Sequence, residues 1–190
     1  EVPEPTVPAI AYPFRTGEAA NHNTATWKGF NVDGSKSNQQ TVKVTFDTAT
    51  ADFSNASYLV VQYKNNSAPG LQYMLSAGGA NYSVSAKEGE RIYFTEEGQT
   101  ESALACKVLY GHINVSQSGK MGALIIPMSS MAWTGTQADR DLAKIDGLTI
   151  TTNSQFNGGF ELLIGEIGLY EGDAGSGTFR KLLNLSEDKS

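Results

Sequence analysis

The stretch 159-GFELLIGEIGLYEG-172 is the most apolar run of the chain, and it carries a carboxylate, Glu166, in its middle. Apolar or aromatic residues fill most positions before Gly165, and Ile167, Leu169 and Tyr170 follow Glu166. A short run that is apolar at consecutive positions indicates a central strand covered on both faces. An unpaired carboxylate buried in such a strand would cost several kcal/mol, so Glu166 needs a partner or must face water.

Strand patterns recur along the rest of the chain. In 41-TVKVTFD-47, Val42, Val44 and Phe46 alternate with polar residues, which predicts a half-buried antiparallel strand. Further strands are expected at 57–64, 71–76, 91–94, 103–115, 121–127 and 147–152, separated by segments rich in Gly, Asn and Ser. Only 138–146 is a helix candidate, and it is long enough for a turn or two. The sequence therefore predicts an all-β fold, an antiparallel sandwich or barrel of roughly eight to ten strands.

Length and charge limit the classes of partner. The chain has 190 residues, which fits one domain. Its net charge of −6 argues against nucleic acid as a partner. No apolar stretch approaches the roughly 20 residues that span a bilayer, so we expect no membrane insertion. The proline-rich residues 1–9 are expected to form a linker, 10–185 the sandwich, and the charged residues 186–190 a linker or tail.

The order of four segments resembles a known family. The segments are 58-YLVVQYKNNSA-68, 122-GALIIPMSSMAW-133, 141-DLAKIDGLTITT-152 and 160-FELLIGEIGLYEG-172. Together they resemble the jelly-roll, galactose-binding-like carbohydrate-binding modules of secreted bacterial polysaccharide-active or surface proteins. The resemblance covers roughly residues 10 to 172. It implies a jelly-roll sandwich, a secreted or cell-surface location, and a polysaccharide or glycan as partner.

The resemblance also implies a structural calcium ion, held by one acidic residue in the last strand and another near the start of the domain. Glu166 stands at the first of these positions, whereas Arg15 occupies the second and Glu18 follows three residues later. Calcium binds six to eight oxygen ligands, so Glu166 and Glu18 are candidate ligands, with Asp33 as a further one. Two alternatives remain open: an ion pair between Glu166 and Arg15, and exposure of Glu166 to solvent.

The sequence does not indicate an enzyme. Glycosidases use two carboxyl groups about 5 to 9.5 Å apart. Glu161 and Glu166 are separated by roughly 16 Å along a strand, and a bulge at Gly165 would change their parity but not that distance. Cys106 lies among small and apolar residues and is expected to be an inert core thiol. His112, six residues later in the same expected strand, would be roughly 20 Å away.

Sugar recognition needs aromatic faces and a few polar groups, and the candidate glycan-binding residues are Trp133, Tyr110, His112, Tyr58, Gln62 and Phe156. Trp133 follows an expected strand and precedes a polar segment typical of a loop, where functional residues concentrate. Tyr110 and His112 share a face of the expected strand 103–115, whose first half is apolar and whose second half is polar.

Tyr58 and Gln62 share a face of the expected strand 57–64, and Phe156 lies in an expected loop. Each candidate has a structural alternative, such as a tryptophan folded over the sandwich edge or a strand end passing into solvent.

The sequence leads to two hypotheses. The first is a non-catalytic carbohydrate-binding module that tethers a larger secreted or surface protein, with neighbouring domains, to a polysaccharide. The second is a structural, spacer or adhesin-type module that has the same fold and no glycan site.

Overall fold

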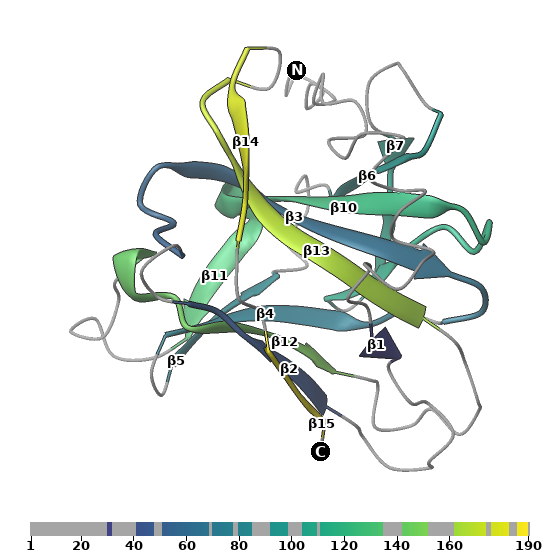
Figure 1. The fold of residues 1–190 in the computed structure, drawn as a ribbon, viewed down its shortest axis with the longest axis horizontal. Helices are drawn as coiled ribbons and strands as arrows, with labels where there is room; N and C mark the ends of the chain where they lie inside the picture. The colour runs from purple at the N-terminus through teal and green to yellow at the C-terminus, as the bar shows by residue number, and fades with distance from the viewer. Residues whose placement is uncertain are drawn as a thin grey trace.

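The computed structural model describes residues 30–31, 41–47, 51–68, 70–77, 80–84, 92–98, 104–109, 111–134, 142–151, 162–173, 176–182 and 186–189. For 30–31, 41–42, 80–84, 104–105, 107–109, 132–134 and 186–189 it describes the backbone alone. Two antiparallel sheets pack face to face (Figure 1). The predicted all-β sandwich is therefore confirmed.

The seven-stranded sheet has in its centre the two longest strands among the described residues. Its members, in spatial order, are β1 (Phe30–Asn31), β13 (Leu162–Glu171), β3 (Ala56–Asn65), β10 (Met121–Pro127), β6 (Tyr93–Glu96) and β7 (Leu104–Ala105). β14 (Thr178–Lys181) also pairs with β13.

The six-stranded sheet forms the second layer. Its order is β11 (Met131–Thr134), β5 (Ala80–Val84), β4 (Gln72–Ala77), β12 (Gly147–Thr151), β2 (Thr41–Thr45) and β15 (Ser186–Lys189). A separate hairpin consists of β8 (Lys107–Leu109) and β9 (His112–Asn114).

The strand pairing gives the connectivity of a jelly roll. β1 pairs with β13, β2 with β12, β3 with β10 and β4 with β5, so four antiparallel pairs are nested in chain order. Successive pairs alternate between the two sheets, and the pairings of β13 with β3 and of β12 with β4 join them. This double-sheet arrangement is one of the ways in which antiparallel folds limit exposed strand edges. The remaining strands extend the edges of this framework.

The core lies between the sheets and follows from alternation in the strands. On β2, Val44 is buried, whereas Lys43 is partly exposed and Thr45 is exposed, as the sequence pattern predicts. β3 and β13 instead bury residues on both faces, as expected of central strands. The largest fully buried side chains are Tyr63, Tyr73, Phe53, Leu59, Leu71, Leu75, Ile92, Ile113, Leu124, Ile125, Ile126 and Ile145.

Residues 103–115, expected as one strand, form three: β7, β8 and β9. The chain reverses between Leu109 and His112, which are cross-strand partners. Gly111 has a φ of 77°, a left-handed conformation that glycine adopts without a steric penalty, and this allows the tight turn. The predicted continuous face from Leu104 to Asn114 is therefore wrong.

Trp133 was expected beside a loop, but its backbone lies in strand β11. The 3-10 turn Met128–Ser130 links β10 in one sheet to β11 in the other, and the Ser130 hydroxyl donates to the Pro127 carbonyl at 2.6 Å. Trp133 pairs with Tyr82, which pairs in turn with the core residue Leu75. The polar sequence after Trp133 did not reveal that the preceding residues cross to the second sheet.

The helix candidate and the C-terminal tail differ from what the sequence predicts. Within 138–146, the described residues contain one 3-10 turn, Leu142–Lys144. Residues 186–189, expected in a linker or tail, form β15 and pair with β2. A charged sequence is typical of an edge strand, because it opposes pairing with further chains. None of the helical turns in the described ranges has the length and apolar character of a membrane-spanning helix.

The close approach of β10 and β3 generates a stability prediction at Gly122, whose cross-strand partner is Tyr63. A Cβ atom at position 122 would lie 2.6 Å from the ring of Tyr63, which is buried in the core. We expect Gly122→Ala to lower the free energy of unfolding by about 1 to 3 kcal/mol in urea titrations, because the ring must move within a packed interior. The exposed strand substitution Thr45→Ala should change it by less than about 0.5 kcal/mol. Equal effects of the two substitutions would contradict this explanation.

Candidate functional site

Three of the residues singled out from the sequence lie on one face of the seven-stranded sheet. Tyr58 and Gln62 on β3 alternate with core residues, so they lie on the face turned away from the six-stranded sheet. Glu166 on β13 lies opposite Gln62 on the same face. We call this the outer face.

One end of the outer face holds an aromatic cluster, defined here as Tyr58, Tyr93, Tyr170 and Phe179. Tyr58 and Tyr170 are cross-strand partners, and their rings meet edge to face with centroids 6.2 Å apart. Burial raises the pKa of Tyr58, and the neighbouring phenols of Tyr93 and Tyr170 raise that pKa further. At neutral pH the Tyr58 hydroxyl is therefore protonated and can donate a hydrogen bond.

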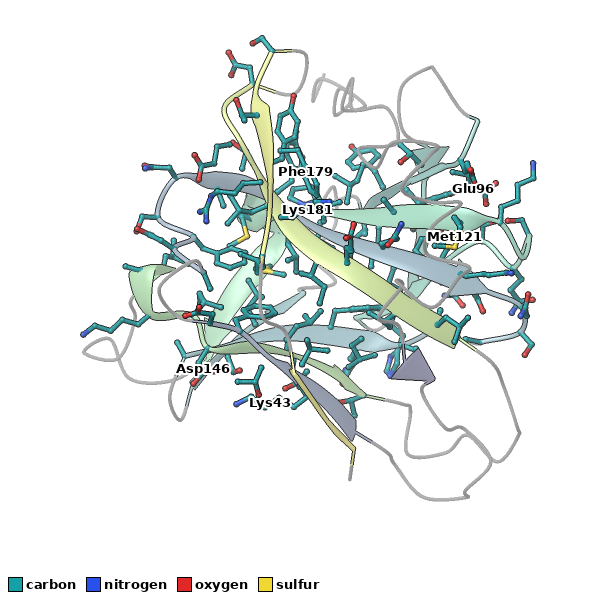
Figure 2. The ribbon with its side chains drawn as sticks, viewed as in Figure 1. Lys43, Glu96, Met121, Asp146, Phe179 and Lys181 are labelled. Carbon is teal, nitrogen blue, oxygen red and sulfur yellow. The ribbon has the colours of Figure 1, made fainter. Side chains whose placement is uncertain are left out.

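Phe179 reaches the aromatic cluster from β14, where it is the partner of Tyr170. A Cβ atom at Gly168 would lie 2.6 Å from the Phe179 ring and equally close to the Arg180 carbonyl. The missing side chain at position 168 is thus what allows the ring to lie against β13. Figure 2 shows Phe179 and Lys181 on β14 beside β13.

A β-bulge in β13 lies next to this cluster. Ile164 pairs with Tyr63 and Ile167 with Val61, so Gly165 and Glu166 together oppose the single residue Gln62. The extra residue changes the parity of the strand. In a regular strand Glu166 would share the core-facing side of Ile164, whereas after the bulge Ile167 takes that side and Glu166 lies on the outer face.

Gln62 fills the gap that the bulge leaves in the hydrogen-bond ladder. Its side chain is fully buried, and its Oε1 accepts a hydrogen bond from the Glu166 backbone amide at 3.1 Å. A second buried polar residue, Thr95, lies in the same cross-strand row beyond Ala123. The outer face therefore carries a polar row beside its aromatic cluster.

Glu166 has Lys181 as an ionic partner, with Oε1 3.5 Å from Nζ. The two side chains are 32% and 34% exposed, respectively, so solvent weakens the pair to about 1 kcal/mol or less. Arg15, Glu18 and Asp33 lie outside the described residues. Within the described ranges, no three His, Cys, Asp or Glu residues group as metal ligands. A calcium ion held by Glu166 and Glu18 stays a prediction.

The other candidates do not gather on the outer face among the described residues. His112 is partly exposed on β9, and its neighbour Ile113 bridges to Leu71 beside the six-stranded sheet. Tyr110 and Phe156 lie outside the described residues, as does the side chain of Trp133. Sequence reasoning gave Tyr170 no binding role and missed Phe179, which lies beyond the last expected strand. The bulge in that strand decides which of its side chains lie on the outer face.

The cysteine lacks the environment of a nucleophile. Burial raises the pKa of the Cys106 thiol to about 12, so the thiol is protonated at neutral pH. Cys106 lies between β7 and β8, and its backbone amide donates to the Ile92 carbonyl at 2.7 Å. Because the chain reverses at Gly111, the distance between Cys106 and His112 that was expected for one continuous strand does not apply. Cys106 is partly buried against the core, and this burial now supports the expected inertness of its thiol.

The bulge generates a prediction for Gln62. Gln62→Met keeps most of the side-chain volume but removes the acceptor for the Glu166 amide, so we expect the free energy of unfolding to fall by about 1 to 3 kcal/mol. Lys64→Met, two residues later on the same strand and face, is the matched control and should change it by less than about 0.5 kcal/mol. Chemical denaturation measures both. Comparable losses would show that the Gln62 acceptor has no special role.

The raised pKa of Cys106 predicts slow alkylation near neutral pH. With iodoacetamide, native protein should react at least about a hundredfold more slowly than denatured protein, since an ordinary thiol has a pKa of about 8.5. The same shift makes Cys106 contribute stability below the unfolded pKa, and this contribution is lost as the pH rises toward the folded value. If the native protein were alkylated as fast as the denatured protein, the raised pKa of the Cys106 thiol would be contradicted. A Cys106→Ser sample controls for reaction at other side chains.

Comparison of the chain with protein-family models, with curated proteins and with solved structures gave no match. The interpretation of the outer face therefore depends on its own geometry and chemistry.

Proposed function

We propose that this domain is a non-catalytic carbohydrate-binding module that tethers a larger secreted or cell-surface bacterial protein to a polysaccharide or glycan. The observation that supports this function is the aromatic cluster beside polar groups on one face of a jelly roll. Neighbouring domains of the larger protein would carry any catalytic activity.

The chemistry of the outer face suits sugar recognition. Sugars present apolar C–H surfaces that pack on aromatic rings, and their hydroxyls need a small number of well-placed polar groups. Tyr58 and Phe179 are partly exposed members of the aromatic cluster, and Tyr58 adds a hydroxyl donor. Glu166 and Lys181 lie next to them and offer an acceptor and a donor.

One observation favours a second function, that of a structural, spacer or adhesin-type module. The middle of the outer face is closed, because Val60, Gln62 and Ile125 are fully buried and Tyr93 is almost so. A face packed in this way would stabilise the domain without contacting a ligand. The domain would then position its neighbours through protein contacts.

Affinity electrophoresis on a panel of polysaccharides separates the two functions. If the aromatic cluster binds sugar, Tyr58→Ala should weaken retention about tenfold or more, since truncation of a central aromatic contact commonly costs over 1 kcal/mol. Tyr58→Phe keeps the ring and should retain most of the binding. Met74→Ala, on the outward face of the six-stranded sheet, is the control and should leave retention unchanged.

Thermal melts of each variant establish that it is folded. Retention of folded Tyr58→Ala equal to that of the unmodified protein would remove the aromatic cluster from binding. Absence of retention of the unmodified protein on every polymer would favour the spacer function.

A further inference from the structure

We infer that the outer face takes an uncharged glycan and discriminates against glycans that carry carboxylate or sulfate groups. This inference rests on the proposed function and specifies its ligand class. It follows from the way the basic residues beside the aromatic cluster are paired.

Lys181 is the cation that a negatively charged sugar would meet beside Phe179. The two residues alternate on β14, where Phe179 pairs with Tyr170 and Lys181 with Gly168, so both side chains lie on the outer face (Figure 2). Lys181 already has Glu166 at 3.5 Å. A carboxylate ligand would have to displace Glu166 or approach it, and like charges repel at that range.

The position of Glu166 is fixed by its backbone. The bulge at Gly165 and Glu166 turns this residue to the outer face, and the hydrogen bond from its amide to Gln62 holds the bulge. Glu166 therefore cannot retreat into the core without loss of that hydrogen bond. On that face the Glu166 carboxylate lies 3.5 Å from Lys181 Nζ and acts as its counter-ion.

The other basic residue of β14, which alternation places on the opposite face of the strand, is also paired. Arg180 lies between Phe179 and Lys181 in sequence, and its Nη2 donates to the Asp52 carbonyl at 3.0 Å and to the Glu171 carboxylate at 3.3 Å. The net charge of the chain, −6, adds a long-range repulsion against polyanions. A neutral sugar avoids both penalties and can bond its hydroxyls to Glu166 and Lys181 at the rim of the aromatic cluster.

The test uses the whole chain in affinity electrophoresis with neutral probes (β-glucan, xylan, galactomannan) and acidic probes (polygalacturonate, alginate, heparin). The unmodified protein should be retained more strongly by at least one neutral polymer than by any of the acidic ones. Glu166→Gln removes the carboxylate that lies beside Lys181, so retention on an acidic polymer should increase at least about threefold. Lys181→Gln, which removes the ammonium group beside Glu166, should show no such gain.

A second ion pair provides matched controls. Lys43 Nζ lies 3.5 Å from Asp146 Oδ1 on the six-stranded sheet, with 40% and 32% exposure. Asp146→Asn changes the net charge as Glu166→Gln does, but on the other sheet, and should not increase retention on acidic polymers. Lys43→Gln is the corresponding control for Lys181→Gln. Thermal melts again establish that each variant is folded.

The outcomes distinguish the preference for uncharged glycans from carbohydrate binding itself. Retention of the unmodified protein mainly on acidic polymers would overturn the inference and leave carbohydrate binding standing. Equal gains for Glu166→Gln and Asp146→Asn would show that net charge alone matters, and would overturn the role of the Glu166–Lys181 pair. A folded Glu166→Gln variant with no gain would do the same. Absence of retention on every polymer would overturn both the inference and the proposed function.

Discussion

The pairing of β3 with β13 is the constraint on which the rest of the structure depends. Each of these strands has ten residues, and both bury side chains on two faces. Their ladder is interrupted where Gly165 and Glu166 oppose Gln62, whose side chain accepts the Glu166 amide. Because the bulge reverses the parity of β13, Ile167 and Leu169 enter the core while Glu166 and Tyr170 lie on the outer face. A regular strand would place a carboxylate and a tyrosine between the sheets.

The position of β14 follows from this pairing. After the bulge, Gly168 takes an outward position, and the absence of a side chain there lets the Phe179 ring lie against β13. Lys181 then comes within reach of Glu166 on the same face. The aromatic cluster, the ion pair and the charge selectivity inferred from them thus share one origin, the extra residue in β13. The same residues explain why a carboxylate is tolerated in the most apolar run of the chain.

Much of the fold was predictable because alternation is a local property of strands. The patterns around Val44 and in β3, β4, β10 and β12 gave strands close to those observed, and the family resemblance gave the jelly roll. Predictions failed where a turn or crossing lay inside an apolar run. The hairpin at Gly111 split one expected strand, and the 3-10 turn at Met128–Ser130 carried Trp133 into a second strand. At both places the side chains on either side of the turn are equally suited to strands, so the pattern does not mark the break.

The sequence by itself determined an all-β fold of strands that bury one or both faces, and it identified Glu166 as the residue that required an explanation. Tyr58 and Gln62 were also placed on a common face from sequence, since their positions in one strand differ by an even number. Only the tertiary structure decided that Glu166 meets Lys181 and that Tyr58 meets Tyr170. Tyr58 and Tyr170 are over a hundred positions apart in the sequence, and Glu166 belongs to the bulge of β13. Both contacts depend on cross-strand register, which is a property of paired strands and is not encoded in the periodicity of either strand alone.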